Sequence, residues 1–240
     1  LSGTITLASH LRLEGEADSF VTVAGQTAPG DGIQLANYGI QIRAGAHDVV
    51  LRHLRIRPSA GAGDFVHDID AIELWGSDGG HVHHVVVDHC SLQWAMDENF
   101  SAWAHVTDVT VQRSLIAEAR VDGQNHQHAK AVLVGAEVND AKPDRFSFHH
   151  NVFAHNPDRN PRIAYATTDF RNNLIYDWGG NNSSLFGPYA GFPSGVKPTD
   201  VNLIGNVWKK GASTRPTYDD AAWLNANTRI FPFANHGTHC

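Results

Sequence analysis

FSFHHNVF, at residues 146–153, is one of six segments of this 240-residue chain that share one pattern. The other five begin at residues 49, 85, 109, 168 and 201, and they are VVLRHLRI, VVVDHCSL, VTVQRSLI, TDFRNNLI and VNLIGNVW. The third position is apolar in all six, and the sixth position is polar in the last four. Alternation of apolar and polar residues on both sides of that sixth position predicts two short strands joined by a sharp bend.

The spacing of the segments indicates a repeated structural unit. Successive segments begin between 22 and 37 residues apart, so each unit carries loops of variable length. A strand pair of this size buries its apolar face only against copies of itself, which is typical of a parallel β-solenoid.

Three asparagines, Asn151, Asn173 and Asn206, occupy the sixth position of the last three segments. Asparagine tolerates the left-handed backbone of a tight bend, and its side-chain amide can bond to the asparagine of the next coil. We therefore predict an all-β, single-stranded parallel β-helix with an asparagine ladder and with long loops on one side.

The composition excludes disordered and helical membrane proteins. Hydrophobic residues make up 42% of the chain, as in globular domains, and no run of 18 apolar residues is present. We expect one domain over residues 1–240, in which residues 211–240, where the repeat is lost, form a C-terminal cap. The chain opens at Leu1 without the features of a signal peptide, so we expect that segment to be absent or already removed.

The charge balance limits the possible partners. The formal net charge is −7, from 18 basic and 25 acidic residues, which argues against a nucleic-acid-binding protein. A polyanionic substrate would also be repelled, unless a local cation or a bound metal reversed the sign of the field at the site.

Ionisable residues recur where one coil leads into the next. Four of them fall on four successive coils, in the order acid, acid, lysine, arginine: Asp70, Asp97, Lys130 and Arg159. Equivalent residues of adjacent parallel strands lie about 4.8 Å apart, so two such carboxylates can share one Ca²⁺. Asp68 and Glu98 stand beside them and can add ligands.

Four blocks of the chain resemble the pectate lyases of polysaccharide lyase family 1. They are VAGQTAPGDG (23–32), VVVDHCSLQWAMDE (85–98), HHNVFAHNPDRNPR (149–162) and DFRNNLIYDWGG (169–180), and the resemblance extends over residues 3–212. The resemblance implies a right-handed parallel β-helix with a Ca²⁺-dependent groove, in a secreted or periplasmic enzyme.

The resemblance also implies roles for individual residues. Asp70 resembles a principal Ca²⁺ ligand with Asp68 beside it, and Asp97 resembles the acidic ligand of the next coil. Lys130 resembles the lysine that holds a substrate carboxylate, and Arg159 the catalytic arginine of an Arg-x-Pro motif.

Two positions depart from the family pattern. Ser101 stands where many members carry a further aspartate ligand, so Ca²⁺ binding is either weaker or completed by Glu98. Ala164 stands where the family has a second arginine, and Arg162 is the nearest residue that can take over its contact with the substrate.

These residues predict a Ca²⁺-dependent pectate lyase that cleaves polygalacturonate by β-elimination. Calcium and Lys130 would neutralise the uronate carboxylate and acidify C5, and Arg159 would act as the base. Because arginine is normally protonated, this role requires neighbouring cations that favour its neutral form, and it predicts alkaline activity. The expected partner is an anionic polysaccharide, with no nucleic acid and no membrane, and we expect a monomer.

Three alternatives stay open. The chain could act on methylated pectin or another uronate polymer, or bind polysaccharide without cleaving it.

Histidines 81, 83, 84, 126 and 128 are spaced like zinc ligands. However, His53, His89 and His150 share one repeat column, which favours ring stacking along the solenoid over zinc binding.

Overall fold

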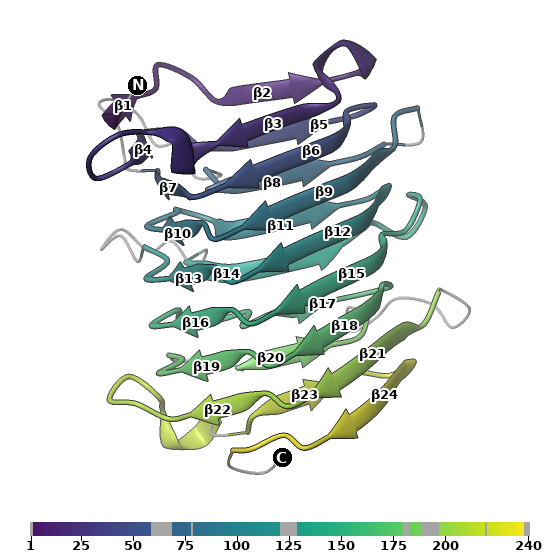
Figure 1. Cartoon of the computed structure of the whole chain (residues 1–240). Helices are drawn as coiled ribbons and strands as arrows, with labels where there is room; N and C mark the ends of the chain where they lie inside the picture. Colours follow the sequence, from purple (N-terminus) through teal and green to yellow (C-terminus); the bar gives the residue numbers. More distant parts are fainter. Residues whose placement is uncertain are drawn as a thin grey trace.

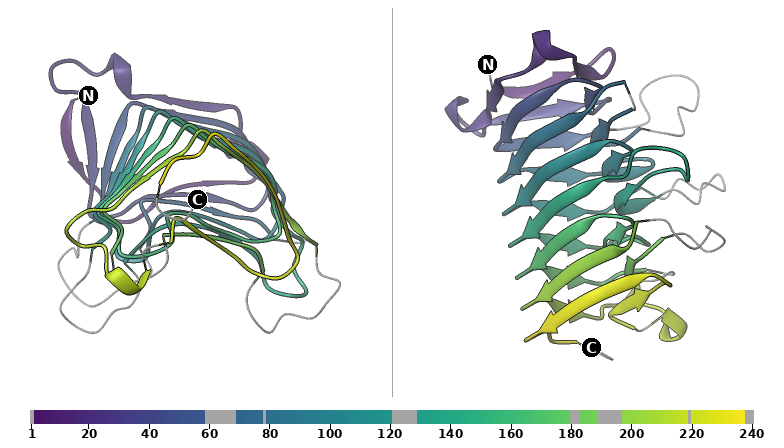
Figure 2. Two further views of the ribbon diagram at one scale, coloured as in Figure 1. Left: turned by 90° about the horizontal axis from the view of Figure 1, so that it is seen from below. Right: turned by 90° about the vertical axis from the view of Figure 1, so that its right-hand side faces the viewer.

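The molecule contains three parallel β-sheets of eight strands each, and the strands of each sheet stack one above the other along its long axis (Figure 1). This computed structural model describes residues 2–58, 69–77, 79–120, 129–179, 183–188, 197–218 and 220–237. Each coil contributes one strand to each sheet, so the predicted right-handed parallel β-helix is confirmed. The view along the axis shows the three sheets enclosing a common interior (Figure 2).

We name the sheets A, B and C in the order in which a coil visits them. Sheet A contains β1 (Gly3–Thr6), β4 (Ile33–Ala36), β7 (Leu54–Arg57), β10 (Ser91–Gln93), β13 (Leu115–Ala117), β16 (Val152–Ala154), β19 (Leu174–Tyr176) and β22 (Val207–Lys209). Sheet B contains β2 (Leu11–Glu14), β5 (Ile40–Arg43), β8 (Ile72–Trp75), β11 (Glu98–Trp103), β14 (Lys130–Gly135), β17 (Arg162–Ile163), β20 (Ser184–Phe186) and β23 (Ala222–Leu224). Sheet C contains β3 (Val21–Ala24), β6 (His47–Arg52), β9 (Val82–Asp88), β12 (Val106–Gln112), β15 (Asp144–His149), β18 (Thr167–Arg171), β21 (Thr199–Ile204) and β24 (Thr228–Phe233).

Helical structure in the described residues is confined to three short 3₁₀ segments, η1 (Glu16–Asp18), η2 (Gly25–Thr27) and η3 (Pro216–Tyr218). None of the helices in that part of the chain has the length and apolar character needed to cross a membrane.

The six repeated segments pair in the register that their alignment predicts. Each consists of a strand of sheet C, a bend and a strand of sheet A, and Val49, Val85, Val109 and Phe146 are direct partners in successive coils. The third positions point inward and form the core: Leu51, Val87, Val111, Phe148, Phe170 and Leu203 are each at most 5% exposed. Full burial of such a side chain stabilises the fold by about 1.5–3 kcal/mol, so the alternation sets the register.

The asparagine ladder is present and is longer than expected. Asn151 Nδ2 donates to Asn173 Oδ1 at 3.2 Å, and Asn173 Nδ2 donates to Asn206 Oδ1 at 3.0 Å. Asn206 Nδ2 continues the ladder to Asn235 Oδ1 at 3.0 Å. The amides also bond backbone groups inside the bend, so buried polar atoms are satisfied where the chain turns.

The left-handed residue of each bend is not the ladder asparagine, contrary to our explanation of that position. The preceding residue has φ between 48° and 64° in each of the six repeated segments, and these residues are His53, His89, Arg113, His150, Asn172 and Gly205. The left-handed turn directs the next side chain into the core, where an amide can bond both neighbouring coils. Two histidines of this column, His53 and His89, stack as expected, with ring centroids 4.8 Å apart.

A second, shorter ladder lies at the entrance to sheet B. Asn99 Nδ2 donates to Asn156 Oδ1 at 3.2 Å, and Asn156 Nδ2 donates to Asn160 Oδ1 at 3.0 Å. All three side chains are at most 1% exposed. Because Glu98 and Arg159 directly adjoin two of these asparagines, the ladder anchors the backbone beside two predicted site residues.

The expected C-terminal cap contains two strands. β23 pairs with β20 in sheet B, and β24 pairs with β21 in sheet C. The coil therefore continues beyond Lys210, although the sequence repeat does not.

Candidate active site

A cluster of three acidic side chains lies where the chain enters sheet B. Asp70, Asp97 and Glu98 each place a carboxylate oxygen within 4.8 Å of those of the other two. Asp70 and Glu98 are 8% and 3% exposed, whereas Asp97 is half-buried. Asp70 accepts hydrogen bonds from the Glu98 backbone N–H at 2.9 Å and from the Ser101 hydroxyl. The loop acids of two successive coils are thus brought together as the sequence predicts.

Burial and like charge make this cluster electrostatically unfavourable without a cation. Desolvation raises the pKa of Asp70 well above its usual range, and the charge of Asp97 raises it further. Desolvation also raises the pKa of Glu98, with Asp70 as the next cause. Two carboxylates with these shifts are poised to gain a proton or a metal ion.

The cationic residues stack directly beside the acids. Lys130, the first residue of β14, is the register partner of Glu98, and its backbone N–H donates to Asp97 O at 2.9 Å. Glu98, and not Asp97, therefore lies directly beside Lys130 in the neighbouring strand. We expected Asp97 at this position, so the expected register is wrong by one residue. The lysine is 7% exposed, and its pKa is lowered by burial and then by the charge of Arg159.

Arg159 reaches across Lys130's strand to the acidic cluster. One terminal nitrogen of its guanidinium donates to Glu98 Oε1, and the arginine side chain is 16% exposed. Its backbone is left-handed, with φ of 56°, and its carbonyl accepts from Val132 N–H at 2.9 Å. The arginine is thus held by strand β14 on one side and by Glu98 on the other.

The position of the family's second arginine is a buried one in this chain. Ala164 is fully buried and packs with Ala104, Ala136 and Tyr165, which leaves no room for a long side chain. Arg162, in β17, is half-buried and opposes Leu133 in β14. Asp68, the remaining predicted ligand, lies outside the described residues.

The acidic cluster opens into a pocket of about 280 Å³ on the face of sheet B. Its lining consists of Asp70, Glu73, Trp75, Asp97, Glu98, Ser101, Trp103 and Leu133. Trp75 is 45% exposed, and the Arg43 guanidinium lies 4.9 Å from its ring centroid and 3.0 Å from Glu73 Oε2. Sequence reasoning missed Glu73 and Trp75, although the alternation of IELW at 72–75 places both on the outer face.

The acidic residues fit a calcium ion. Ca²⁺ binds oxygen atoms at 2.3–2.6 Å, so the ligands of one ion lie up to about 5 Å apart, as these carboxylates do. The Ser101 hydroxyl adds a neutral oxygen beside Asp70.

No family model matches the chain, but curated relatives do. It is 32% identical over 197 residues to a probable pectate lyase C of Aspergillus flavus, which covers 82% of this chain and 41% of that protein. It is 30% identical over 197 residues to a probable pectate lyase C of Emericella nidulans, which covers 82% and 39%. The chain is a homologue of the pectate lyases. It spans about two fifths of the length of these relatives.

Solved structures share the fold of this pectate lyase homologue. The cedar pollen allergen Jun a 1 superposes with a TM-score of 0.60 at 15% identity, covering 99% of this chain and 69% of that one. Pectate lyase II of Xanthomonas campestris gives a TM-score of 0.57 at 17% identity, covering 99% and 66%. The resemblance drawn from the motifs is therefore confirmed in sequence and in fold.

Proposed function

We propose that this chain carries the active site of a Ca²⁺-dependent pectate lyase, which cleaves polygalacturonate by β-elimination. The observation that supports this function best is the position of Lys130 and Arg159 directly beside a trio of acids, two of them buried. Lys130 and Arg159, together with a Ca²⁺ ion on the acids, would make the local charge positive in a chain whose net charge is −7, and a polyanion requires that reversal. The homology to pectate lyases supports the same reaction.

Asp70, Asp97 and Glu98 would hold the calcium, together with Asp68. When bound, the ion neutralises the uronate carboxylate and so makes the C5 proton more acidic. Ser101 contributes a hydroxyl where a further carboxylate would add negative charge, so we expect moderate calcium affinity.

The chain's own cations would carry the remaining steps. Lys130 binds the substrate carboxylate through its ammonium group. Arg162, in the strand of sheet B next to that of Lys130, binds the polymer further along. Arg159, in its neutral form and oriented by its hydrogen bond to Glu98, would take the proton from C5. The C4–O bond then breaks, the departing oxygen gains a proton from water, and a 4,5-unsaturated sugar remains.

The proposed substrate indicates where the enzyme acts. Pectin is an extracellular polymer, so we propose a secreted or periplasmic enzyme that acts as a monomer and as a single domain over residues 1–240. We assign it no nucleic-acid or membrane partner.

The direct test is ultraviolet absorbance of unsaturated product from polygalacturonate, with chelator and then with added Ca²⁺. We expect product that disappears with chelator and returns with Ca²⁺. Reducing ends without unsaturation would indicate a hydrolase and overturn the proposal. Turnover of methylated pectin alone would assign the other lyase activity, and binding without product would assign a polysaccharide-binding solenoid.

A further inference from the structure

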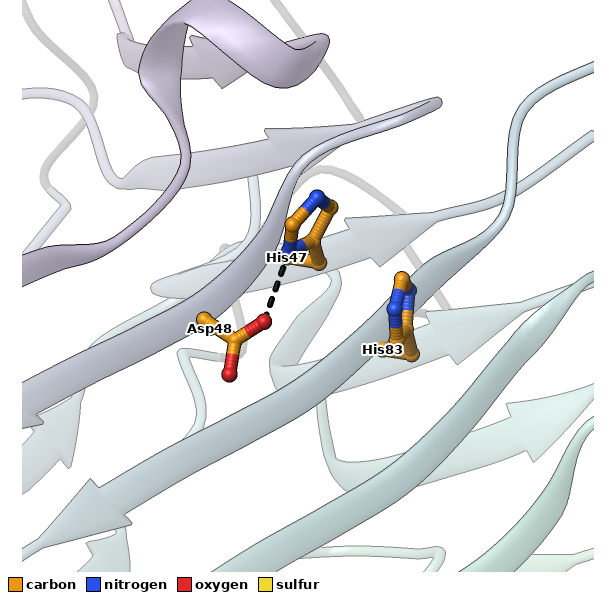
Figure 3. Close-up of side chains that lie close together, drawn as sticks. All are labelled: His47, Asp48 and His83. Carbon is orange, nitrogen blue, oxygen red and sulfur yellow. Dashed lines mark hydrogen bonds and ion pairs between the residues drawn. The ribbon is translucent and has the colours of Figure 1, made fainter.

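Sheet C carries a second cluster of metal-binding side chains, separate from the acids of sheet B. His47 and Asp48 begin strand β6, and His83 lies in β9, where it is the register partner of His47. One ligand atom from each of the three lies within 4.8 Å of the others. Figure 3 shows the two imidazoles side by side on neighbouring strands, with the Asp48 carboxylate beside His47.

The backbone explains why adjacent residues meet in one cluster. Successive side chains of a strand normally point to opposite faces. Asp48 and His84 have left-handed backbones, with φ of 53° and 54°, and this interrupts the alternation in both strands. As a result, Asp48 Oδ2 lies 2.7 Å from His47 Nδ1 and 3.6 Å from His84 Nδ1.

His83 leaves a ring nitrogen unsatisfied at this place. Its Nδ1 is sealed from solvent and has no hydrogen-bond partner in the part of the chain that the structure describes. The His83 ring is held on both sides, by His47 at a centroid distance of 4.7 Å and by His81 at 4.4 Å. A buried nitrogen without a partner destabilises a fold unless something binds it.

A carboxylate contacts the ring nitrogen of His47 that is not bonded to Asp48. Glu16 Oε2, in η1, lies 2.7 Å from His47 Nε2. Metal-binding histidines are commonly oriented in this way, because an acceptor on one ring nitrogen leaves the other free to coordinate. With Glu16 on Nε2, the His47 Nδ1 atom faces Asp48.

We propose that His47, Asp48 and His83 bind one divalent transition-metal ion of the zinc class, with His84 as an additional donor. The ion takes the place of the proton shared by His47 and Asp48. Imidazole nitrogens with one carboxylate suit Zn²⁺, Ni²⁺ or Cu²⁺, whereas Ca²⁺ takes oxygen ligands. Only His83 and His84 belong to the set whose spacing suggested zinc, because His47 and Asp48 come from the preceding coil.

The site is structural and independent of the proposed lyase reaction. Its ligands and the supporting Glu16 come from three successive coils, so a bound ion cross-links the N-terminal part of the solenoid. An ion that binds only the folded chain stabilises it, and at 100 times its Kd the ratio of folded to unfolded protein rises about 100-fold.

The test measures zinc binding by calorimetry on the tag-free, chelator-treated chain, in saturating Ca²⁺ so that the acids of sheet B are occupied. We expect one equivalent of Zn²⁺ to bind with a micromolar or lower Kd, with a rise in Tm. His83→Gln and Asp48→Asn should each weaken binding at least tenfold, and Glu16→Gln about tenfold or more. Asp70→Asn should bind Zn²⁺ as the wild type does, which separates the two metal sites.

His89→Gln is the matched control, because His89 belongs to a stacked histidine pair on the same two coils. It should retain wild-type zinc affinity. Circular dichroism and metal-free unfolding of each variant establish that it folds. No binding by the wild type, or equal loss in His89→Gln and His83→Gln, would overturn the proposal and leave the histidines as a stacking array only.

Discussion

Arg159 is the residue that we propose as the base, and its contacts orient its side chain. Its guanidinium is tied to Glu98 and lies beside Lys130, and a left-handed backbone residue directs it over the neighbouring coil. The planar guanidinium can hold a substrate with one nitrogen while presenting another, which a compact ammonium cannot do.

Arg159→Lys should therefore keep the charge, and much of the substrate binding, but lose the positioned base. We expect kcat to fall by roughly 10²–10⁴-fold with a smaller change in KM, measured on polygalacturonate at saturating Ca²⁺. Arg162→Lys is the control and should retain most of kcat. Loss of turnover in Arg162→Lys alone would assign the base to Arg162, and wild-type kcat in both variants would refute an arginine base.

Asp70→Asn removes one carboxylate from the acidic trio while keeping an acceptor for the Glu98 N–H. Because calcium affinity depends on the number of charged ligands, we expect at least about a tenfold rise in the Ca²⁺ concentration needed for half-maximal activity. Asp200→Asn, at a surface ion pair with Arg229, is the control and should behave like the wild type. An unchanged calcium titration in Asp70→Asn would mean that the metal binds elsewhere.

At the scale of the element, the unit of this fold is a strand, a left-handed residue, an inward-pointing residue and a second strand, and in the later coils the inward residue is an asparagine. Alternation identifies the strands, because only one register buries the apolar face. The left-handed position is occupied by histidine, arginine, asparagine or glycine, so no residue type marks it. That is why the bend could be located from sequence while its left-handed residue was assigned one position too late.

Asn173→Ala tests the ladder. The change deletes donors to Phe148 O and Asn206 Oδ1 and the acceptor of the Asn151 amides. We expect a loss of about 1–3 kcal/mol in the free energy of unfolding, with calcium affinity unchanged. Asn202→Ala, at an exposed position of β21, should stay within about 0.5 kcal/mol of the wild type in the same denaturant titration. Equal stability of the two variants would contradict a structural role for the ladder.

At the scale of the whole molecule, two buried carboxylates link stability to pH. The folded chain raises the pKa of Asp70 and Glu98, so it retains protons that the unfolded chain releases above about pH 4. A folded state that binds more protons loses stability as the pH rises, and the loss continues through the raised pKa values. Calcium bound at the proposed site would supply positive charge and oppose this loss.

We therefore expect that, in chelator, the free energy of unfolding of the wild type falls from pH 4.5 to pH 8 relative to that of Asp70→Asn. Added Ca²⁺ should stabilise the wild type more at pH 8 than at pH 5. Denaturant titrations of both proteins across this pH range provide the measurement. Parallel curves for the two proteins would show that Asp70 is not buried as a charged group.

The sequence by itself determined the coil, its register and the ladder, because an alternating apolar pattern is a local property that repeats wherever a coil repeats. It also predicted that the loop acids, Lys130 and Arg159 lie together on successive coils. Only the tertiary structure decided that Glu98 is the strand partner of Lys130 and accepts a hydrogen bond from Arg159, and that the Ser101 hydroxyl donates to Asp70. Loop lengths and left-handed residues between coils set those side-chain directions, and neither follows from alternation. The His47, Asp48 and His83 cluster has the same origin, since its members meet only when separate coils stack.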